Sequence, residues 1–134
     1  MHKYIFLFLL SLIVGCTSAA PTLNGRAYRL DTGPHSIPVT LYFDTYGNHY
    51  TGTFMNDYAG FYTVSGTQED PRVDFRNVNV LRDNYRTAHL KAEDRYLSLL
   101  AAMKYFRIEK DRLYLSGRRG ETLEFIQTNY IPEE

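Results

Sequence analysis

The residue of this sequence most open to covalent chemistry is Cys16, the only cysteine in 134 residues. It follows a short positively charged start and an apolar run over residues 4–14, which ends at the small residue Gly15. A charged start, an apolar middle and small residues at the end are typical of a secretory signal peptide. The run is too short to cross a bilayer as a helix, which takes about 20 residues.

The residues around this cysteine resemble a bacterial lipobox. Ile13-Val14-Gly15-Cys16 has an aliphatic residue, a tolerant position, a small residue and then cysteine. In proteins with this motif the sulfur is alkylated with a diacylglyceryl group, the peptide is cut before the cysteine, and the new amine is acylated. Several buried acyl chains anchor stably, because each methylene contributes about 0.8 kcal/mol and one chain anchors only marginally. The resemblance implies a signal peptide over residues 1–15 and a tether over residues 16–22, lipidated at Cys16.

The next residue, Thr17, is not acidic. By resemblance to lipoprotein sorting in Gram-negative bacteria, this favours attachment to the outer membrane, with the domain facing the periplasm. An ordinary cleavage site is the alternative, because Ser18-Ala19-Ala20 also has small residues two positions apart. Cleavage after Ala20 would release a soluble protein without a cysteine. On either interpretation no intramolecular disulfide can form, so packing must stabilise the fold.

Residues that could bind a metal or catalyse a reaction lack the required spacing. The sequence contains no phosphate-binding glycine loop, no zinc-protease motif and no nucleophile elbow. His35, His49 and His89 are scattered, and a pair such as His89 and Glu93 falls short of the four ligands of a structural zinc site. We interpret carboxylate pairs such as Glu93-Asp94 as solvated surface charge. The sequence therefore predicts no catalytic residue, metal or cofactor, and a protein that is not an enzyme.

The remaining candidates for binding are tyrosine and asparagine residues in two neighbouring predicted turns. They are Tyr46 and Asn48 in the first turn and Asn56, Asp57 and Tyr58 in the second. Rigid aromatic rings and adaptable amides are the contacts that antibody paratopes use. Alternatively, Asn56 and Gly60 serve turn geometry and Tyr58 packs on the rim of the barrel. Nucleic acid is not an expected partner, since the formal net charge is +0 and no global field attracts it.

Strands must position these turns, because the hydrophobic period is mostly two. Val39, Leu41 and Phe43 share one face of the clearest strand, which starts at residue 37. Residues 49–55 are expected to form the returning strand, residues 56–60 to break it, and residues 61–65 to form another. Further on, the apolar face shifts by one residue. The shift indicates a β-bulge near Arg76-Asn77, or the meeting of two strands.

A helix is expected in the last third of the chain. Tyr96, Leu99, Leu100 and Met103 recur at i, i+3, i+4 and i+7. With about eight short strands, this predicts a mostly β, α+β fold: a small antiparallel barrel-like sheet with one packed helix in its C-terminal half. The barrel interior should be filled by side chains, which makes a small-molecule ligand unexpected. The expected filling residues are Phe43, Phe75, Leu99, Met103 and Phe106.

The order of these elements is similar to the META domain of HslJ-type bacterial envelope proteins, over residues 23–130. The opening motif corresponds to Leu23, Gly25, Tyr28 and Leu30. The glycine-rich middle segment with its asparagine corresponds to residues 52–62. The helix with an early glutamate, here Glu93, then runs into an aromatic-x-Ile strand, a turn and a Leu-x-Leu strand at residues 105–115. One departure is that Met55 precedes Asn56 where many members have cysteine, so a family disulfide is absent.

The resemblance implies a barrel-like sheet with one packed helix and no established catalytic residue. Members of the family are linked to envelope stress, motility, virulence and novobiocin tolerance. We therefore expect an envelope lipoprotein that the lipid on Cys16 attaches to the outer membrane and that binds or stabilises another envelope component. The alternative is a small binding module for an apolar ligand, or an inhibitor of a secreted enzyme such as lysozyme.

Overall fold

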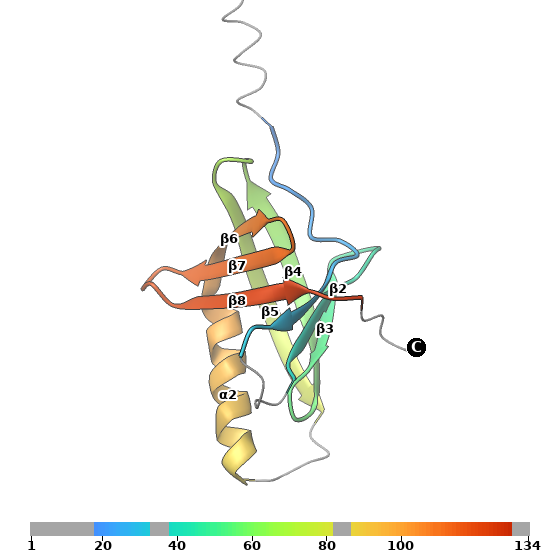
Figure 1. Cartoon of the computed structure of the whole chain (residues 1–134), viewed down its shortest axis with the longest axis vertical. Helices are drawn as coiled ribbons and strands as arrows, with labels where there is room; N and C mark the ends of the chain where they lie inside the picture. The colour runs from blue at the N-terminus through green and yellow to red at the C-terminus, as the bar shows by residue number, and fades with distance from the viewer. Residues whose placement is uncertain (1–17, 33–37, 82–86, 130–134) are drawn as a thin grey trace, which may run out of the picture.

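The computed structural model describes residues 18–32, 38–81 and 87–129, which form a closed antiparallel barrel of eight strands with a helix packed against it (Figure 1). Neighbours in the barrel are neighbours in the sequence, and β1 pairs with β8 to close it. The predicted mostly β barrel with one helix in the C-terminal half is confirmed. The strands are β1 Ala27–Leu30, β2 Thr40–Phe43, β3 His49–Thr53, β4 Asp57–Gly66, β5 Pro71–Leu81, β6 Met103–Glu109, β7 Arg112–Gly117 and β8 Thr122–Gln127, and the helix is α2 Thr87–Ala102.

Alternation of apolar and polar residues builds the barrel as expected. Leu41 and Phe43 of β2 are buried, as are Leu113 and Leu115 of β7. Their aromatic neighbours pack edge to face, with the rings of Phe43 and Tyr62 4.9 Å apart. The interior is filled by side chains, and four of the five predicted filling residues are buried. Leu99 is only half-buried, and Leu100 takes its place in the core.

The long hairpin of β4 and β5 contains the predicted bulge. Ala59 pairs with Asn79 and Phe61 with Arg76, so β5 takes three steps where β4 takes two. The extra residue falls just after Arg76 and turns the apolar face over, which accounts for the shifted pattern in the sequence.

The predicted break at residues 56–60 is wrong beyond Asn56, because β4 already begins at Asp57. The glycines Gly52 of β3 and Gly60 of β4 belong to the sheet for a steric reason. Tyr50 pairs with Gly60, and Tyr58 pairs with Gly52 on the neighbouring strand. A Cβ atom on Gly52 would overlap the Tyr58 hydroxyl and the carbonyl oxygen of Thr40. Each glycine thus leaves room for the tyrosine ring that crosses it, and does not mark a turn.

The helix ends one residue earlier than its hydrophobic period suggests. α2 stops at Ala102, and Met103 is the first residue of β6, although its side chain is buried as expected. A second register shift accounts for the burial: Met103 pairs with Gly117 and Tyr105 with Ser116. The extra residue in β6 lets Met103 and Phe106 both face the core.

The helix also packs beside the barrel seam that has the fewest paired residues. β5 and β6 share a single pair, Arg72 with Tyr105, and α2 packs on β5 beyond it (Figure 1). An amphipathic helix here replaces strand pairing with side-chain packing. No helix among the described residues has the length and apolar character needed to cross a bilayer.

The first described residues lie on the barrel. Ala19 forms a β-bridge with Thr67, and the carbonyl oxygen of Ser18 accepts the backbone N–H of Gln68 at 3.0 Å. The segment therefore starts beside the β4–β5 turn at the top of Figure 1 and leads to Leu23, which is fully buried. Residues 18–22 of the predicted tether are in contact with the domain, whereas Cys16 and residues 1–15 lie outside the described residues.

The crossing of glycine and tyrosine can be tested with Gly52→Ala. The added methyl group must displace the Tyr58 ring or the β2 backbone, so we expect the free energy of unfolding to fall by about 1–3 kcal/mol in chemical denaturation. Thr51→Ala, at the exposed neighbouring position, should change it by no more than about 0.5 kcal/mol. Equal effects of the two substitutions would contradict the steric explanation.

Candidate functional site

A buried polar junction joins the helix to the turn between β3 and β4. The Glu93 side chain, on α2, has no exposed surface. Its Oε2 accepts the backbone N–H of Asn56 at 2.8 Å, and the Asn56 side-chain amide donates to Oε1 at 3.2 Å and to Oε2 at 3.3 Å. Backbone and side chain of one turn residue thus both serve one carboxylate. Hydrogen bonds to a charged acceptor are the stronger kind, and they offset the cost of burying it.

Two tyrosines extend this junction into the sheet. The Tyr58 hydroxyl donates to the carbonyl oxygen of Thr40 at 2.6 Å, and it lies 2.6 Å from the Tyr96 hydroxyl. Because Tyr58 has one proton and gives it to the carbonyl, Tyr96 must be the donor between the two hydroxyls. Burial raises the pKa of Tyr58 well above its usual range, and the neighbouring Tyr96 raises it further. Burial likewise raises the pKa of Tyr96.

The interpretation of Glu93 as solvated surface charge is wrong. The signal that could have revealed its burial is the helix period, because Glu93 precedes Tyr96 by three residues and Leu100 by seven, on the apolar face. A carboxylate on that face needs donors, and the sequence does not show that a turn 37 residues away supplies them. No three potential metal ligands come together among the described residues.

The junction is suited to holding the helix and not to reacting with a ligand. Glu93 and Tyr96 are buried, so a ligand could reach them only if α2 moved away from the barrel. The ring of Phe54, in the same turn, lies 5.6 Å from that of Tyr96 and packs over the junction. The ring contact of Phe54 with Tyr96 and a charged hydrogen-bond cluster therefore attach the turn to the helix.

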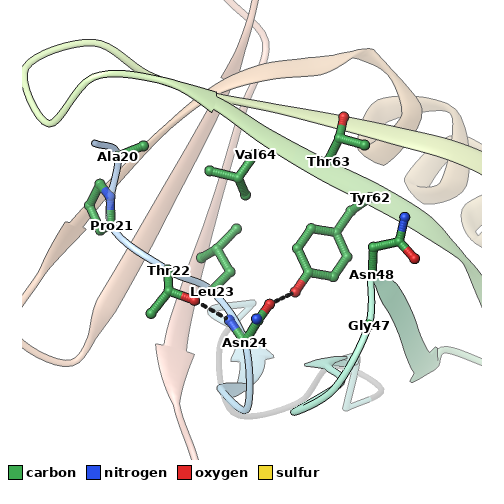
Figure 2. Close-up of a pocket in the computed structure, with 10 residues that line it drawn as sticks. All are labelled: Ala20, Pro21, Thr22, Leu23, Asn24, Gly47, Asn48, Tyr62, Thr63 and Val64. Atoms are coloured by element: carbon green, nitrogen blue, oxygen red, sulfur yellow. Dashed lines mark hydrogen bonds between the residues drawn. The ribbon is translucent and has the colours of Figure 1, made fainter. Parts of the chain in front are cut away.

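A groove of about 390 Å³ opens on another part of the barrel (Figure 2). Residues 20–24 form one wall, residues 62–64 of β4 form the other, and residues 47–48 close one end. Leu23 and Val64 point toward each other across it, and the Tyr62 hydroxyl donates to the Asn24 side-chain oxygen. None of the lining residues has a charged side chain. The groove therefore offers apolar surface bordered by amides and an aromatic ring.

The structure separates the five predicted binding residues into two groups. Asn48 lines the groove, and Tyr46, on the same turn, is 83% exposed. Asn56 and Tyr58 are buried at the helix junction, with Asp57 exposed between them. The two turns are close in sequence but stand at opposite ends of β3, so these residues do not form one surface. Lipidation of Cys16, outside the described residues, stays a prediction.

The groove residues Asn24, Tyr62 and Val64 were not among the sequence candidates. Tyr62 and Val64 alternate with polar residues in β4 and read as ordinary core positions. Only the path of residues 20–24 across the barrel turns them into the walls of a groove, and that path depends on contacts with β4 and with the β4–β5 turn.

Comparisons with known proteins identify this architecture. The family model described as META domain matches residues 21–130. A protein from Burkholderia xenovorans solved by NMR is similar at 20% identity, with a TM-score of 0.61 over 81% of this chain and 85% of that one. A second NMR structure gives 14% identity and a TM-score of 0.58, over 78% of this chain and 90% of that one.

A crystal structure of a DUF4847 family protein from Bacteroides vulgatus gives 17% identity and a TM-score of 0.52, over 69% of this chain and 61% of that one. At these identities the structural neighbours show the fold alone. No curated protein matches the chain.

The junction predicts a marked cost for Glu93→Ala. The substitution leaves the Asn56 donors buried without their acceptor, which costs about 1–3 kcal/mol for each unsatisfied group. We expect chemical denaturation to show a loss of at least about 2 kcal/mol. Arg95→Ala, exposed on the same helix, should stay within about 0.5 kcal/mol. A small effect of Glu93→Ala would show that water replaces the carboxylate.

The buried tyrosines predict a loss of stability at alkaline pH. An unfolded tyrosine ionises near pH 10, whereas Tyr58 and Tyr96 keep their protons to higher pH in the fold. Their contribution is therefore complete below about pH 10 and is lost as the pH rises through the raised folded pKa values. The urea concentration at the denaturation midpoint should decrease as the pH is raised from about 9 to about 11.5.

The matched variant for this test is the double substitution Tyr58→Phe, Tyr96→Phe. It should be less stable at neutral pH but should lose less stability on alkalisation, because two of the ionising groups are gone. Some slope should remain, since burial also raises the pKa of Tyr28 and Tyr62. An unchanged slope would mean that other groups dominate the alkaline transition.

Proposed function

We propose, from the premise that this chain belongs to the META domain family, that it is an envelope lipoprotein whose barrel binds another envelope component and catalyses no reaction. Lipid on Cys16 would hold it at the periplasmic face of the bacterial outer membrane. The observation that carries this proposal is the lipobox-like Ile13-Val14-Gly15-Cys16 directly before the folded domain. A cysteine placed there is in position to become a membrane anchor with the domain immediately behind it.

The contacts of Ser18 and Ala19 support a close attachment. They hold the chain at the β4–β5 turn, and only Thr17 separates Ser18 from Cys16. Two residues span at most about 7 Å. A lipid on Cys16 would therefore bring the β4–β5 turn to the membrane surface, and the free part of the tether would be much shorter than residues 16–22.

The length of β5 sets which end of the domain would face away from the membrane. Its 11 residues, Pro71–Leu81, extend about 30 Å at the usual rise of a strand. The far end has Leu81, which is 66% exposed. The helix junction at the β3–β4 turn lies toward that same end, since Asp57 pairs with Leu81.

A binding role suits the groups that the described residues present. The buried carboxylate is enclosed, and the groove offers uncharged contact surface in place of a nucleophile with a neighbouring base. The alternative of an apolar ligand inside the barrel finds no support, because Phe43, Phe75 and Phe106 fill that interior.

The anchor predicts incorporation of a labelled fatty acid into the protein in cells. We expect label on the wild type and none on Cys16→Ala, and the wild type should sediment with outer membranes. An unlabelled wild type that is released without detergent would remove the lipoprotein proposal.

Orientation can be measured separately, since the chain contains no tryptophan. In vesicles with brominated lipid, lipidated Gln68→Trp at the β4–β5 turn should be quenched, whereas Leu81→Trp should not, because about 30 Å separates them. Quenching of neither variant, in protein that is labelled and vesicle-bound, would reject the orientation and keep the anchor.

A further inference from the structure

One stretch of β4 has no strand beside it. The ladder between β3 and β4 ends at the pair His49–Phe61, followed by one more hydrogen bond from the Tyr62 N–H to the Asn48 carbonyl at 2.8 Å. The next backbone contact on that side is the β-bridge between Thr67 and Ala19, with the Gln68 N–H bonded to the Ser18 carbonyl oxygen. β4 nevertheless continues as a regular strand to Gly66, paired on its other side with β5. The barrel closure therefore leaves a short open edge between two occupied positions.

The backbone of Val64 faces this edge. In a strand, residues two apart point their N–H and C=O groups to the same side. Because the Tyr62 N–H points toward Asn48, the Val64 N–H and C=O point the same way, and neighbouring Thr63 and Ser65 face β5. No backbone group of a described residue pairs with Val64 on the open side. Val64 therefore presents a donor and an acceptor with the spacing that an added strand uses.

The groove lies along this same edge (Figure 2). The half-buried side chains of Ala20, Pro21 and Val64 provide apolar surface, and the amides of Asn24 and Asn48 stand at its margins. Natural sheets usually cover or charge an open edge to prevent unwanted pairing. The edge at Val64 has neither protection, because residues 20–24 stand apart from it and the lining has no charged side chain.

We propose that this groove binds an extended, uncharged peptide segment of a partner protein, which adds to β4 at Val64 as a short strand. Backbone hydrogen bonds would supply affinity, and a small apolar side chain would pack on the half-buried Val64 side chain. A charged side chain there would lose water without gaining an ion partner. The inference rests on the proposed function only where it takes the partner to be an envelope protein. The groove itself is formed by described residues.

The probe is the acetylated and amidated tripeptide Thr-Val-Thr, because the edge between the pairs at Tyr62 and Thr67 is only a few residues long. It is titrated into the ¹⁵N-labelled protein as recovered from cells, in detergent if it is lipidated. We expect amide shifts centred on Val64 and its neighbours, with a Kd on the order of 1 mM for so short a strand. A peptide N-methylated at the central valine cannot pair its backbone and should bind at least about tenfold more weakly.

The matched protein variants are Val64→Pro and Val64→Ala. Proline removes the edge N–H but no ladder hydrogen bond, so the barrel should remain folded while binding falls at least about tenfold. Alanine keeps the N–H and should retain binding within about threefold. If Val64→Pro fails to fold, the N-methylated peptide still decides the question.

Three outcomes would overturn the inference. These are no shifts at about 5 mM peptide, shifts confined to another surface, or equal binding of the N-methylated peptide. Fatty-acid labelling is unaffected by any of them, so loss of the peptide site and loss of the lipid anchor remain distinguishable.

Discussion

The fold depends on how the carboxylate of Glu93 is buried. A charged group with no exposed surface must be hydrogen-bonded, and Asn56 supplies both a backbone and a side-chain donor. Those donors lie in the β3–β4 turn, so the helix is satisfied only when it packs on that turn. Such a cluster adds less to net stability than its hydrogen bonds suggest, because burying the charge is costly. Its main consequence is geometric: it defines one position of α2 on the barrel.

That position matters because one seam of the barrel has few paired residues. β5 and β6 share one pair, and the helix packs on β5 beyond that pair. The register shifts near Arg76 and Met103 turn side chains inward on either side of this seam. The tyrosine–glycine pairs of β3 and β4 close the neighbouring part of the wall, where Tyr58 also reaches Tyr96 of the helix. Junction, seam and wall thus form one connected structure.

The two ends of the molecule consequently have different properties. Near the helix junction, polar groups are enclosed and paired, as with Glu93 and Asn56. Near the β4–β5 turn, the N-terminal segment pairs with Thr67 through Ala19 and leaves a groove and an open strand edge. A domain held from this end would carry its groove close to the membrane. The end near the β4–β5 turn is therefore better suited to contact with a partner than the end near the helix junction.

The sequence by itself determined the features that depend on neighbouring residues. Alternation placed Leu41 and Phe43 in a strand, the shifted period indicated the bulge near Arg76, and the helical period found Tyr96 and Leu100 on the core face. The resemblance to the META domain also came from the order of these local patterns. Each pattern can be recognised in the sequence because side-chain periodicity within a strand or a helix follows directly from backbone geometry.

Only the tertiary structure decided which distant residues meet. Glu93 is buried against Asn56, and Gly60 lies in a strand opposite Tyr50. Asn48 lines a groove together with Asn24, whereas Tyr58 contacts the helix. In each case a side chain finds its partner across the barrel. Local periodicity contains no information on that distance, because strand pairing and helix docking are chosen by the packing of the whole core.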